Sequence, residues 1–457
     1  MVVLVGLAID QIAQSGLSSL SVIYYSAQLF STKDVDNFGG NIPFIKPGDL
    51  DKGGFITETS DTLTESGLLT VPKLPVNAIV VTCIGNLGKV GITTKISATN
   101  QQINSFICNE NLNFKFLYYQ ICTLKPWLEN ESSATTIAIV NKGKFSKAPI
   151  SIPSLAEQKI IADKLDTLLA QVDSTRARLE QIPQTLKRFR QTVLAAAVSG
   201  KLTEEWRVSN GLKYWETQKI GNIVSQIESG KSLKCLETPP QEHEYGIVKI
   251  SAVTWGEYNE NESKTLPNKK DFIETRRVND GDFLISRANT LELLGAPVIV
   301  HKATKNLMLS DKVLRLVMEN EHKKWLSIFL RSPSGRKEIE SRSTGNQLSM
   351  RNIGQKSLLD IDLPKPPIEE QHEIVRRVEK LFIYADTIEK QVQNALECVN
   401  NLTQSILAKA FRGDLTAQWR AENPDLISGE NSAQALLAKI QQQRKSTKTI
   451  KRSKGNS

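Results

Sequence analysis

The sequence has few cysteines, few histidines and few aromatic residues. It contains five cysteines, four histidines and 6% aromatic residues in 457 positions. The cysteines are scattered, and no histidine lies at a metal-ligand spacing from them. This argues against a disulfide scaffold or a structural zinc site, and for a reducing cytoplasm. No apolar run reaches about 18 residues, so no membrane span is predicted.

The common nucleotide-binding and catalytic motifs are also missing. No GxxxxGK[ST] or GxGxxG loop occurs, and the run Gly85–Lys89 has the wrong spacing for a phosphate-binding loop. Glu369 and Glu370 stand at the start of a predicted helix, where carboxylates favour the helix dipole. No serine or cysteine has a credible histidine partner. We therefore expect a protein that is not a catalyst by itself and that needs no cofactor or metal ion.

The net charge of +9 is concentrated at one end of the chain. From Asn431 onward there are seven lysine and arginine residues and no acid, which leaves +2 for residues 1–430. Such an end is usually flexible and solvated, and sometimes binds polyanions. We expect a basic tail over 421–457. The nearly neutral remainder does not by its charge alone indicate nucleic-acid binding.

The strongest signal is an internal repeat. PSLAEQKIIADKLDTLLAQVD begins at Pro153 and PPIEEQHEIVRRVEKLFIYAD begins at Pro366, an offset of 213 residues. At the same offset, QTVLAAAVSGKLTEEWR matches QSILAKAFRGDLTAQWR. Over 153–207 the gapless match has 15 identities in 55 positions. A period this long indicates a tandem duplication and not a solenoid.

Both copies of the repeat are predicted to be long helices. Apolar residues recur at alternating steps of four and three from Ile161 in the first copy and from Ile374 in the second. This period of 3.5 residues is typical of a coiled coil, and two separate amphipathic helices are the alternative. Gly200 and Gly413 are placed to end the helices. The seam alone does not distinguish antiparallel from parallel packing.

A globular segment precedes each helix. Both segments contain short β-rich runs separated by turn residues. IPFIKPGDL in the first resembles GIVKISAV in the second, and PVNAIVVTCIGNLGKVGI resembles VNDGDFLISRANTLELLGAPVIV. The predicted order is a globular domain at 1–152, a helix at 153–207, a globular domain at 208–363, a helix at 364–420 and the tail at 421–457.

The helical sequences quoted above carry a resemblance to a known family. Over 153–207 and 364–435 they resemble the specificity subunits of type I restriction–modification systems, in particular the type IA group. The resemblance implies an α+β fold with two mixed α/β target recognition domains in tandem. It also implies that the two long helices pack as an antiparallel coiled coil, with pseudo-two-fold symmetry.

The same resemblance implies a function and a set of partners. It implies a non-catalytic subunit that confers specificity for double-stranded DNA. Such a subunit would assemble with two modification (methyltransferase) subunits and two restriction (motor–nuclease) subunits. Because the two globular domains differ in sequence, we expect an asymmetric, bipartite DNA site with an unread gap.

The first 30 residues depart from the family pattern. Family members usually begin with a segment that contains a tryptophan, followed by a Gly-x-Thr-Pro-like turn. The second domain keeps a version of this pattern at Trp215 and Glu228–Lys231, whereas residues 1–30 do not. We expect an altered or frame-shifted start that affects the first strand of domain one, and so its activity.

Base reading requires bidentate polar side chains on exposed loops, with Arg or Lys for guanine and Asn or Gln for adenine. Residues of these types in polar loops are therefore the candidate base contacts. In domain one they are Lys46, Asn86, Lys89, Asn100, Gln101, Gln102 and Asn104. In domain two they are Arg287, Asn289, Lys312, Asn346 and Gln347. For each of them, a role in a turn or a solvated loop is the alternative.

Cations on the helices are candidates for contacts with partner subunits, or simply a solvated surface: Arg176, Arg178, Lys187, Arg188 and Arg190. Three other classes of protein remain as alternatives. A stand-alone DNA-binding module would bind DNA specifically without partners, and a coiled-coil adaptor would not bind DNA. An enzyme with an unrecognised site is the third alternative.

Overall fold

The protein divides into two compact units. Unit 1 comprises Met1–Arg178 and Ala395–Ser457, and unit 2 comprises Leu179–Asn394. Each unit thus contains one globular domain and parts of both long helices. The structure, a computed structural model, describes residues 13–16, 21–25, 35–132, 137–254, 256–347 and 350–453. No helix among these residues is long and apolar enough to span a membrane.

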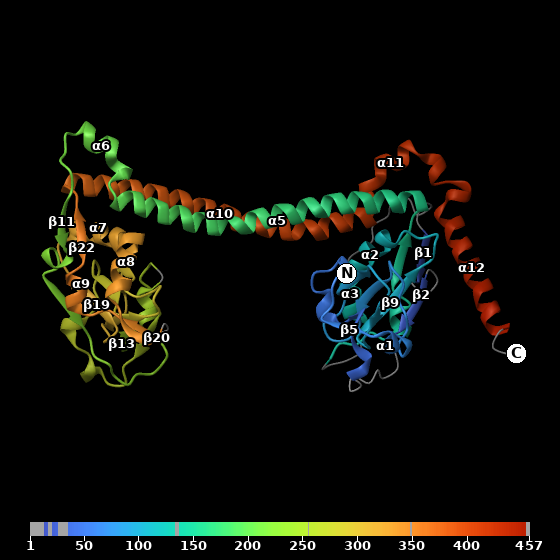
Figure 1. The fold of residues 1–457 in the computed structure, drawn as a ribbon, viewed down its shortest axis with the longest axis horizontal. Coiled ribbons are helices and arrows are strands. Elements are labelled where there is room, and N and C mark those ends of the chain that lie inside the picture. The colour runs from blue at the N-terminus through green and yellow to red at the C-terminus, as the bar shows by residue number, and fades with distance from the viewer. Residues whose placement is uncertain are drawn as a thin grey trace. The chain divides into compact units, whose positions relative to one another are not determined.

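Unit 1 is built on a mixed five-stranded sheet and a second, three-stranded sheet (Figure 1). The first sheet has the order β2 (Ser21–Tyr25), β9 (Ile103–Cys108), β6 (Ile79–Thr82), β7 (Val90–Thr93) and β4 (Phe55–Ile56). The second has the order β5 (Asp61–Leu63), β3 (Phe38–Ile45) and β8 (Ala98–Thr99). Its helices are α1 (Glu65–Leu69), α2 (Phe114–Cys122), α3 (Lys125–Glu131) and α4 (Lys142–Phe145).

Unit 2 has a similar strand order built from different residues, with one strand fewer in its first sheet and one additional three-stranded sheet. Its four-stranded sheet has the order β12 (Gln226–Ser229), β19 (Val313–Val317), β15 (Phe283–Ser286) and β17 (Pro297–Ile299). Its three-stranded sheets are β14 (Ser263–Thr265), β13 (Tyr245–Val248), β18 (Asn306–Met308), and β16 (Ala288–Asn289), β21 (Met350–Asn352), β20 (Thr344–Gln347). Besides its parts of the long helices, its helices are α6 (Glu204–Ser209), α7 (Asn320–Arg331), α8 (Pro333–Arg342) and α9 (Gln355–Leu359). The predicted tandem α+β fold is confirmed.

Short 3₁₀ helices complete the connections in both units. They are η3 (Val35–Asn37), η4 (Pro47–Leu50), η5 (Lys201–Thr203), η6 (Ile220–Asn222), η7 (Ile250–Val253), η8 (Lys269–Asp271), η9 (Glu274–Arg276), η10 (Asp414–Thr416), η11 (Pro424–Leu426) and η12 (Gly429–Asn431).

A two-stranded ribbon leads from each domain into its long helix. In unit 1, β1 (Ala13–Gly16) pairs antiparallel with β10 (Pro149–Ile152). In unit 2, β11 (Glu216–Lys219) pairs in the same way with β22 (Asp362–Lys365). A first strand is therefore present in domain one, although the tryptophan-containing segment and the Gly-x-Thr-Pro-like turn of the family are missing from the sequence there. Residues 1–12, 17–20 and 26–34, on which the expectation of an altered start mostly rests, lie outside the described residues.

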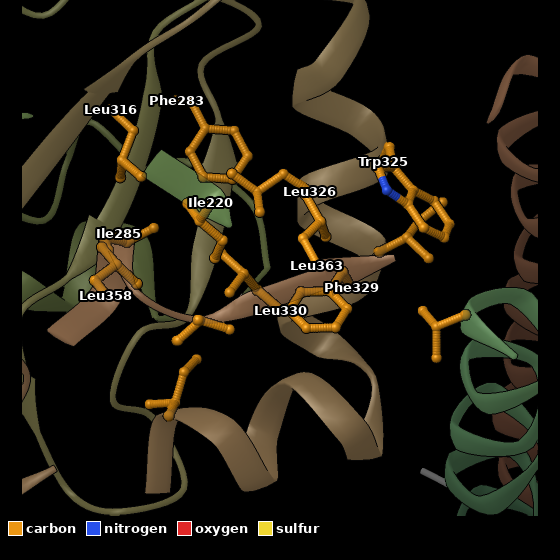
Figure 2. Close-up of a cluster of buried hydrophobic side chains, with 14 of the residues drawn as sticks. Ile220, Phe283, Ile285, Leu316, Trp325, Leu326, Phe329, Leu330, Leu358 and Leu363 are labelled. Carbon is orange, nitrogen blue, oxygen red and sulfur yellow. The ribbon is translucent and has the colours of Figure 1, made fainter. Parts of the chain in front are cut away.

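The largest core of unit 2 lies between α7 and the four-stranded sheet. Figure 2 shows side chains of α7, among them Leu326 and Phe329, on the same cluster as Phe283 and Ile285 of β15. Trp325 of α7 is also buried in this cluster. The buried residues of α7 lie on one face of the helix, which packs on the sheet. β15 is buried on both faces, because Phe283 and Ile285 join this cluster and Leu284 joins another.

The two long helices, α5 (Leu155–Val198) and α10 (Ile368–Phe411), each have 44 residues. In unit 1 the beginning of α5 meets the end of α10, where Ile161 and Leu165 pack against Leu407. In unit 2 the end of α5 meets the beginning of α10, where Arg190 Nη2 donates to Asp386 Oδ1 at 2.6 Å. Both contacts require antiparallel helices, so this prediction is confirmed.

A buried glutamate joins the two helices in unit 2. Glu370, near the start of α10, is 0% exposed. Its carboxylate accepts hydrogen bonds from Thr203 Oγ1 at 2.7 Å and Arg207 Nε at 2.9 Å. Trp215 Nε1 donates to the same carboxylate at 2.8 Å, and Arg207 Nη2 donates to Gly200 O at 2.6 Å. Glu370 therefore binds the turn that follows α5, a role beyond the predicted interaction with the helix dipole.

Unit 1 contains the same network one repeat away. Glu157 Oε1 accepts hydrogen bonds from Thr416 Oγ1 and Arg420 Nη1, both at 2.6 Å. Arg420 Nη2 donates to Gly413 O at 2.8 Å. Gly413 has a φ of +84°, a conformation that side chains with a Cβ rarely adopt. The duplication thus preserves this side-chain network as well as the apolar seam between the helices. We call the network of Glu157 or Glu370 with its threonine and arginine partners the glutamate latch.

A second duplicated contact ties each globular domain to a long helix. In unit 1, Asp166 of α5 accepts hydrogen bonds from Lys115 Nζ and Tyr119 Oη of α2, both at 2.5 Å. In unit 2, Lys324 Nζ of α7 donates to Glu379 Oε1 of α10 at 2.8 Å. Asp166 and Glu379 are repeat equivalents, so each domain is fixed to its helix at the same position.

The segment predicted as a flexible tail contains a packed helix. α11 (Ala417–Glu422) is followed by α12 (Ala433–Ser453), which lies against β1 (Figure 1). Leu436 and Ile440 of α12 are buried in the core cluster of domain one. Gln443 Oε1 accepts a hydrogen bond from Asn111 Nδ2 at 2.9 Å. Apolar residues at a spacing of four explain the docking, which the positive charge of the segment obscured.

Replacing both Leu436 and Ile440 by alanine is expected to loosen domain one. Each replacement of a buried leucine or isoleucine by alanine lowers the free energy of unfolding by about 2–5 kcal/mol. Hydrogen exchange should increase in β1 and β10, while unit 2 stays unchanged. The exposed Lys439→Ala on the same helix is the control and should change stability by less than about 0.5 kcal/mol. Unchanged exchange in β1 would contradict the role of α12.

Candidate nucleic-acid interface

In unit 2 the backbone gathers the predicted base-reading residues at one edge. Arg287 follows β15, and its N–H donates to Lys312 O at 2.8 Å. Arg287 O accepts from Ile353 N at 3.1 Å. β16 pairs with β21, which places Asn289 opposite Arg351. Residues from three distant parts of the chain therefore meet at this edge.

The β20–β21 hairpin extends the same edge. It carries Asn346 and Gln347, whose side chains lie outside the described residues. Arg351, which the sequence reasoning missed, holds the hairpin: its Nη2 donates to Ser343 Oγ at 2.8 Å and its Nη1 to Gly345 O at 2.5 Å. All five candidates of domain two thus belong to one neighbourhood. We call it the unit 2 edge: Arg287, Asn289, Lys312, Asn346, Gln347 and Arg351.

The loop after β12 also reaches this edge. Gly230 N donates to Ser310 O at 3.1 Å, two residues before Lys312. A Cβ at Gly230 would lie 1.6 Å from Leu309 O, so only glycine permits this close approach. The loop then presents Lys231 and Lys234 to solvent. The Ser-Gly-Lys sequence was the available signal for these two lysines, which were not among the predicted contacts.

Unit 1 has the same backbone frame. Cys83 N donates to Gln102 O at 2.8 Å, and Cys83 O accepts from Val140 N at 2.9 Å. Asn100 N donates to Ile45 O at 3.1 Å, which places Lys46 beside this loop. These bonds match those around Arg287, with Cys83 and Gln102 at the positions of Arg287 and Lys312. Most candidates of domain one therefore also gather at one edge.

The side chains in unit 1 are less free than predicted. Lys46 forms an ion pair with Asp61, and Lys89 forms one with Asp51. Asn104 lies in β9, is 4% exposed, and its Nδ2 is 3.5 Å from Val140 O. Asn104 is therefore a core residue and not a base contact in this structure, because the strand turns it inward. Asn86 and Gln101 are exposed.

The remaining candidates differ in how far their side chains are exposed or hydrogen-bonded. Asn100 and Gln102 are bound to each other, with Asn100 Nδ2 donating to Gln102 Oε1 at 3.0 Å. In unit 2 Lys312 is exposed and Arg287 is half-buried. Asn289 Oδ1 accepts a hydrogen bond from Thr290 N at 2.8 Å.

Among the residues that the structure describes, one group could supply several metal ligands: Glu319, Glu321 and His322, whose ligand atoms lie within 4.8 Å of one another. Both glutamates are exposed, and exposed carboxylates often cluster without an ion. Nothing else in the structure gives this group a function.

Comparison with known proteins agrees with this architecture. The family model of the type I restriction modification DNA specificity domain matches residues 22–184 and 213–398. The chain is 48% identical over 321 residues to the EcoKI specificity subunit of Escherichia coli K12, covering 68% of each chain. It is 36% identical over 439 residues to the EcoBI specificity subunit of Escherichia coli, covering 91% of this chain and 89% of that one.

Solved structures show the same fold at low sequence identity. A chain from a study of complex assembly and conformational transition of the type I R-M system matches with a TM-score of 0.67, at 16% identity, over 90% of this chain and 99% of its own length. The HsdS subunit from Thermoanaerobacter tengcongensis matches with a TM-score of 0.58 over the same shares, also at 16% identity. The chain belongs to the type I restriction–modification DNA specificity family and is a non-catalytic DNA specificity subunit of a type I restriction–modification complex.

Proposed function

We propose that the chain reads an asymmetric, bipartite site on double-stranded DNA, with one half-site read by the edge of each unit. The duplicated backbone frame with different side chains is the observation that supports this. Arg287 and Lys312 occupy the positions that Cys83 and Gln102 occupy in unit 1. Two edges with one backbone frame would approach DNA alike, whereas different side chains would read different base pairs.

The side chains at the two edges suggest preferences for different bases. Arg287 and Lys312 in unit 2 are suited to the O6 and N7 acceptors of guanine. Gln101 and Gln102 in unit 1 are suited to adenine. The exposed Lys231 and Lys234 would contact phosphates, which fix the register without reading sequence.

In the complex, this chain would position partners that perform the chemistry. We propose that it assembles with two modification subunits and two restriction subunits. The modification subunit would flip the target adenine out of the duplex to methylate it. Such a complex would act in the cytoplasm, where its DNA lies.

The test is methylation mapping. The chain is co-expressed with a type IA modification subunit in a methylation-free host, and N6-methyladenine is read across the genome by single-molecule sequencing. An asymmetric motif with two defined halves supports the proposal. A motif with one defined half would mean that domain one does not read DNA. A soluble complex that produces no motif would favour the adaptor alternative.

Each of the two edges provides one variant for this experiment. Arg287→Ala is expected to relax one base pair in one half-site, because a bidentate contact contributes about 1–3 kcal/mol of discrimination, or roughly 5- to 150-fold. Gln102→Ala, at the pseudo-equivalent edge of unit 1, should relax only the other half-site. If both variants altered the same half-site, the assignment of one edge to each half would be wrong.

A further inference from the structure

The unit 2 edge and its counterpart in unit 1 each expose one large apolar side chain at the same position of the repeat. In unit 2 this is Met350 of β21, which is 49% exposed, and in unit 1 it is Ile137, which is 54% exposed. The two residues are 213 positions apart, which is the offset of the internal repeat. One exposed apolar side chain on a surface is ordinary. Two at the same position of dissimilar domains indicate a shared use.

The backbone shows independently that the two positions are equivalent. Val140, three residues after the exposed isoleucine, donates its N–H to Cys83 O at 2.9 Å. Ile353, three residues after the exposed methionine, donates its N–H to Arg287 O at 3.1 Å. Val140 and Ile353 are both 0% exposed, so each anchors its segment in the core of its own domain. The exposed isoleucine and methionine therefore stand at the same point of the two backbone frames.

Core packing does not require a large apolar side chain at this position. Among the residues that the structure describes, neither the exposed isoleucine nor the exposed methionine belongs to a hydrophobic core cluster. The next residue is Ala138 in unit 1 and Arg351 in unit 2. The residue after that is Ile139 in unit 1 and Asn352 in unit 2. The repeats thus differ beside this position and agree at it, which points to an apolar ligand group that both edges meet.

The hairpin that carries Met350 has a shape that fits the major groove of DNA. β20 and β21 are antiparallel, and Gln347 is the register partner of Met350. Register partners occupy one face of such a hairpin. The major groove of B-DNA admits a two-stranded β-ribbon, and an A·T pair presents there the adenine N6 and N7 atoms, which suit a glutamine. The same pair presents the C5 methyl group of thymine, which is the apolar group that the groove offers.

The surroundings of Met350 favour DNA over an apolar protein surface. Lys312 and Lys231 are exposed at the same edge and would attract phosphates. Arg351 is engaged within the hairpin, where its Nη2 donates to Ser343 Oγ at 2.8 Å, so it supports the ribbon. A protein partner would need a contiguous apolar patch, whereas the unit 2 edge around Met350 is polar and basic.

We propose that Met350 and Ile137 each contact the C5 methyl group of one thymine, Met350 in the half-site read by unit 2 and Ile137 in the half-site read by unit 1. This inference rests on the proposed function, in which the edge of each unit reads one half-site. It adds one apolar specificity contact to each edge, which a search for polar base-reading residues does not find. It also requires that each half-site contains at least one A·T pair.

The test removes the methyl group from the DNA. Uracil forms the same base pair with adenine as thymine does, but it lacks the C5 methyl group. The full-length chain, in complex with the modification subunit, is titrated with duplexes that carry the motif found by methylation mapping, with one thymine at a time replaced by uracil. For the wild type we expect one sensitive thymine in each half-site. There the replacement should weaken binding about fourfold, the factor that corresponds to the burial of one methyl group.

Variants of the chain assign each thymine to its residue. Met350→Ala should weaken binding and abolish the uracil effect in one half-site, and Ile137→Ala should do the same in the other half-site. Met350→Leu keeps an apolar side chain and should keep the uracil effect.

Two exposed apolar residues away from the edges provide matched controls. Val317 is 37% exposed and lies at the opposite end of β19 from Lys312. Leu69 is 77% exposed and lies in α1, which contacts η3 before the start of β3, whereas Lys46 follows the end of β3. Val317→Ala and Leu69→Ala should change neither the affinity nor the uracil effect. All substituted side chains are exposed, so thermal unfolding should match the wild type.

The inference fails if no thymine in either half-site is sensitive to uracil, or if both alanine variants act on the same half-site. It also fails if Met350→Ala weakens binding equally on thymine and uracil duplexes. In that case a rise in 2-aminopurine fluorescence on binding of the wild type would indicate that Met350 unstacks a base step as an apolar wedge. The proposed function is tested separately, because it fails only if methylation mapping finds no bipartite motif.

Discussion

Replacing Glu370 by alanine is expected to lower the free energy of unfolding of unit 2 by about 3–5 kcal/mol, the usual cost of removing one partner from a buried ion pair. The substitution leaves the Arg207 guanidinium, whose side chain is 13% exposed, without its carboxylate. It also removes the acceptor of Thr203 Oγ1 and Trp215 Nε1. These three donors would then be buried or half-buried without a partner, and burial without a hydrogen bond is costly.

Hydrogen exchange of the full-length chain is the suitable measurement, because a chain of two units does not unfold in one step. Exchange in the turn after α5 and at the start of α10 should accelerate in the Glu370→Ala variant. Glu157→Ala is the matched control and should accelerate exchange in unit 1 only. The double variant Glu370→Leu with Arg207→Met should recover the part of the loss that comes from the unpaired guanidinium, because apolar pairs often replace buried ion pairs at little cost. Thr203 Oγ1 and Trp215 Nε1 still lack their acceptor in this variant. An effect below about 1 kcal/mol in the single variant would show that the latch is not a stabilising element.

Replacing Arg315 by methionine is expected to destabilise the sheet of unit 2 by a similar amount, about 3–5 kcal/mol. Arg315 of β19 is 9% exposed and lies between two carboxylates. Its Nε donates to Glu228 Oε2 at 2.8 Å and its Nη1 to Asp282 Oδ2 at 2.9 Å. Burial lowers the pKa of Arg315, but Glu228 and Asp282 raise it, and the net shift is upward. The methionine would keep the volume, leave Asp282 without a cation, and leave Glu228 with only the more exposed Arg276.

Hydrogen exchange of the full-length chain measures this effect. Exchange in β12, β15 and β19 should accelerate in the Arg315→Met variant, while exchange in unit 1 stays unchanged.

Arg276→Ala is the control for this experiment. Arg276 binds the same Glu228 at 3.2 Å, but its side chain is 30% exposed. An ion pair of this exposure contributes at most about 1 kcal/mol. If Arg315→Met were no more destabilising than Arg276→Ala, the buried network would not support the sheet.

The long helices and their ends were predictable because their signals are local. The 3.5-residue period sets the seam, and the offset of 213 residues identified Glu157 and Glu370 as equivalents before any contact was known. The short strands were predictable as β-rich runs of sequence, but their pairing into sheets was not. β3 and β8, for example, pair across more than fifty residues. The direction of helix packing followed from the family resemblance and not from the seam.

The base-reading candidates show where sequence reasoning stops. Residue type and loop position selected Lys46 and Asn104, but neither property reveals what a side chain contacts. Lys46 reaches Asp61, and Asn104 points into the core. Arg351 and Lys231 were missed because they join the unit 2 edge through a hairpin and a glycine contact that connect distant segments.

The sequence by itself determined the duplication, the helices, the family and the absence of the common catalytic motifs, because each is written in neighbouring residues or in a fixed offset. Only the tertiary structure decided which polar side chains remain exposed and that α12 packs on domain one. These outcomes depend on long-range packing and on charge partners. A long side chain finds its partner in space, and its position along the chain does not specify that partner.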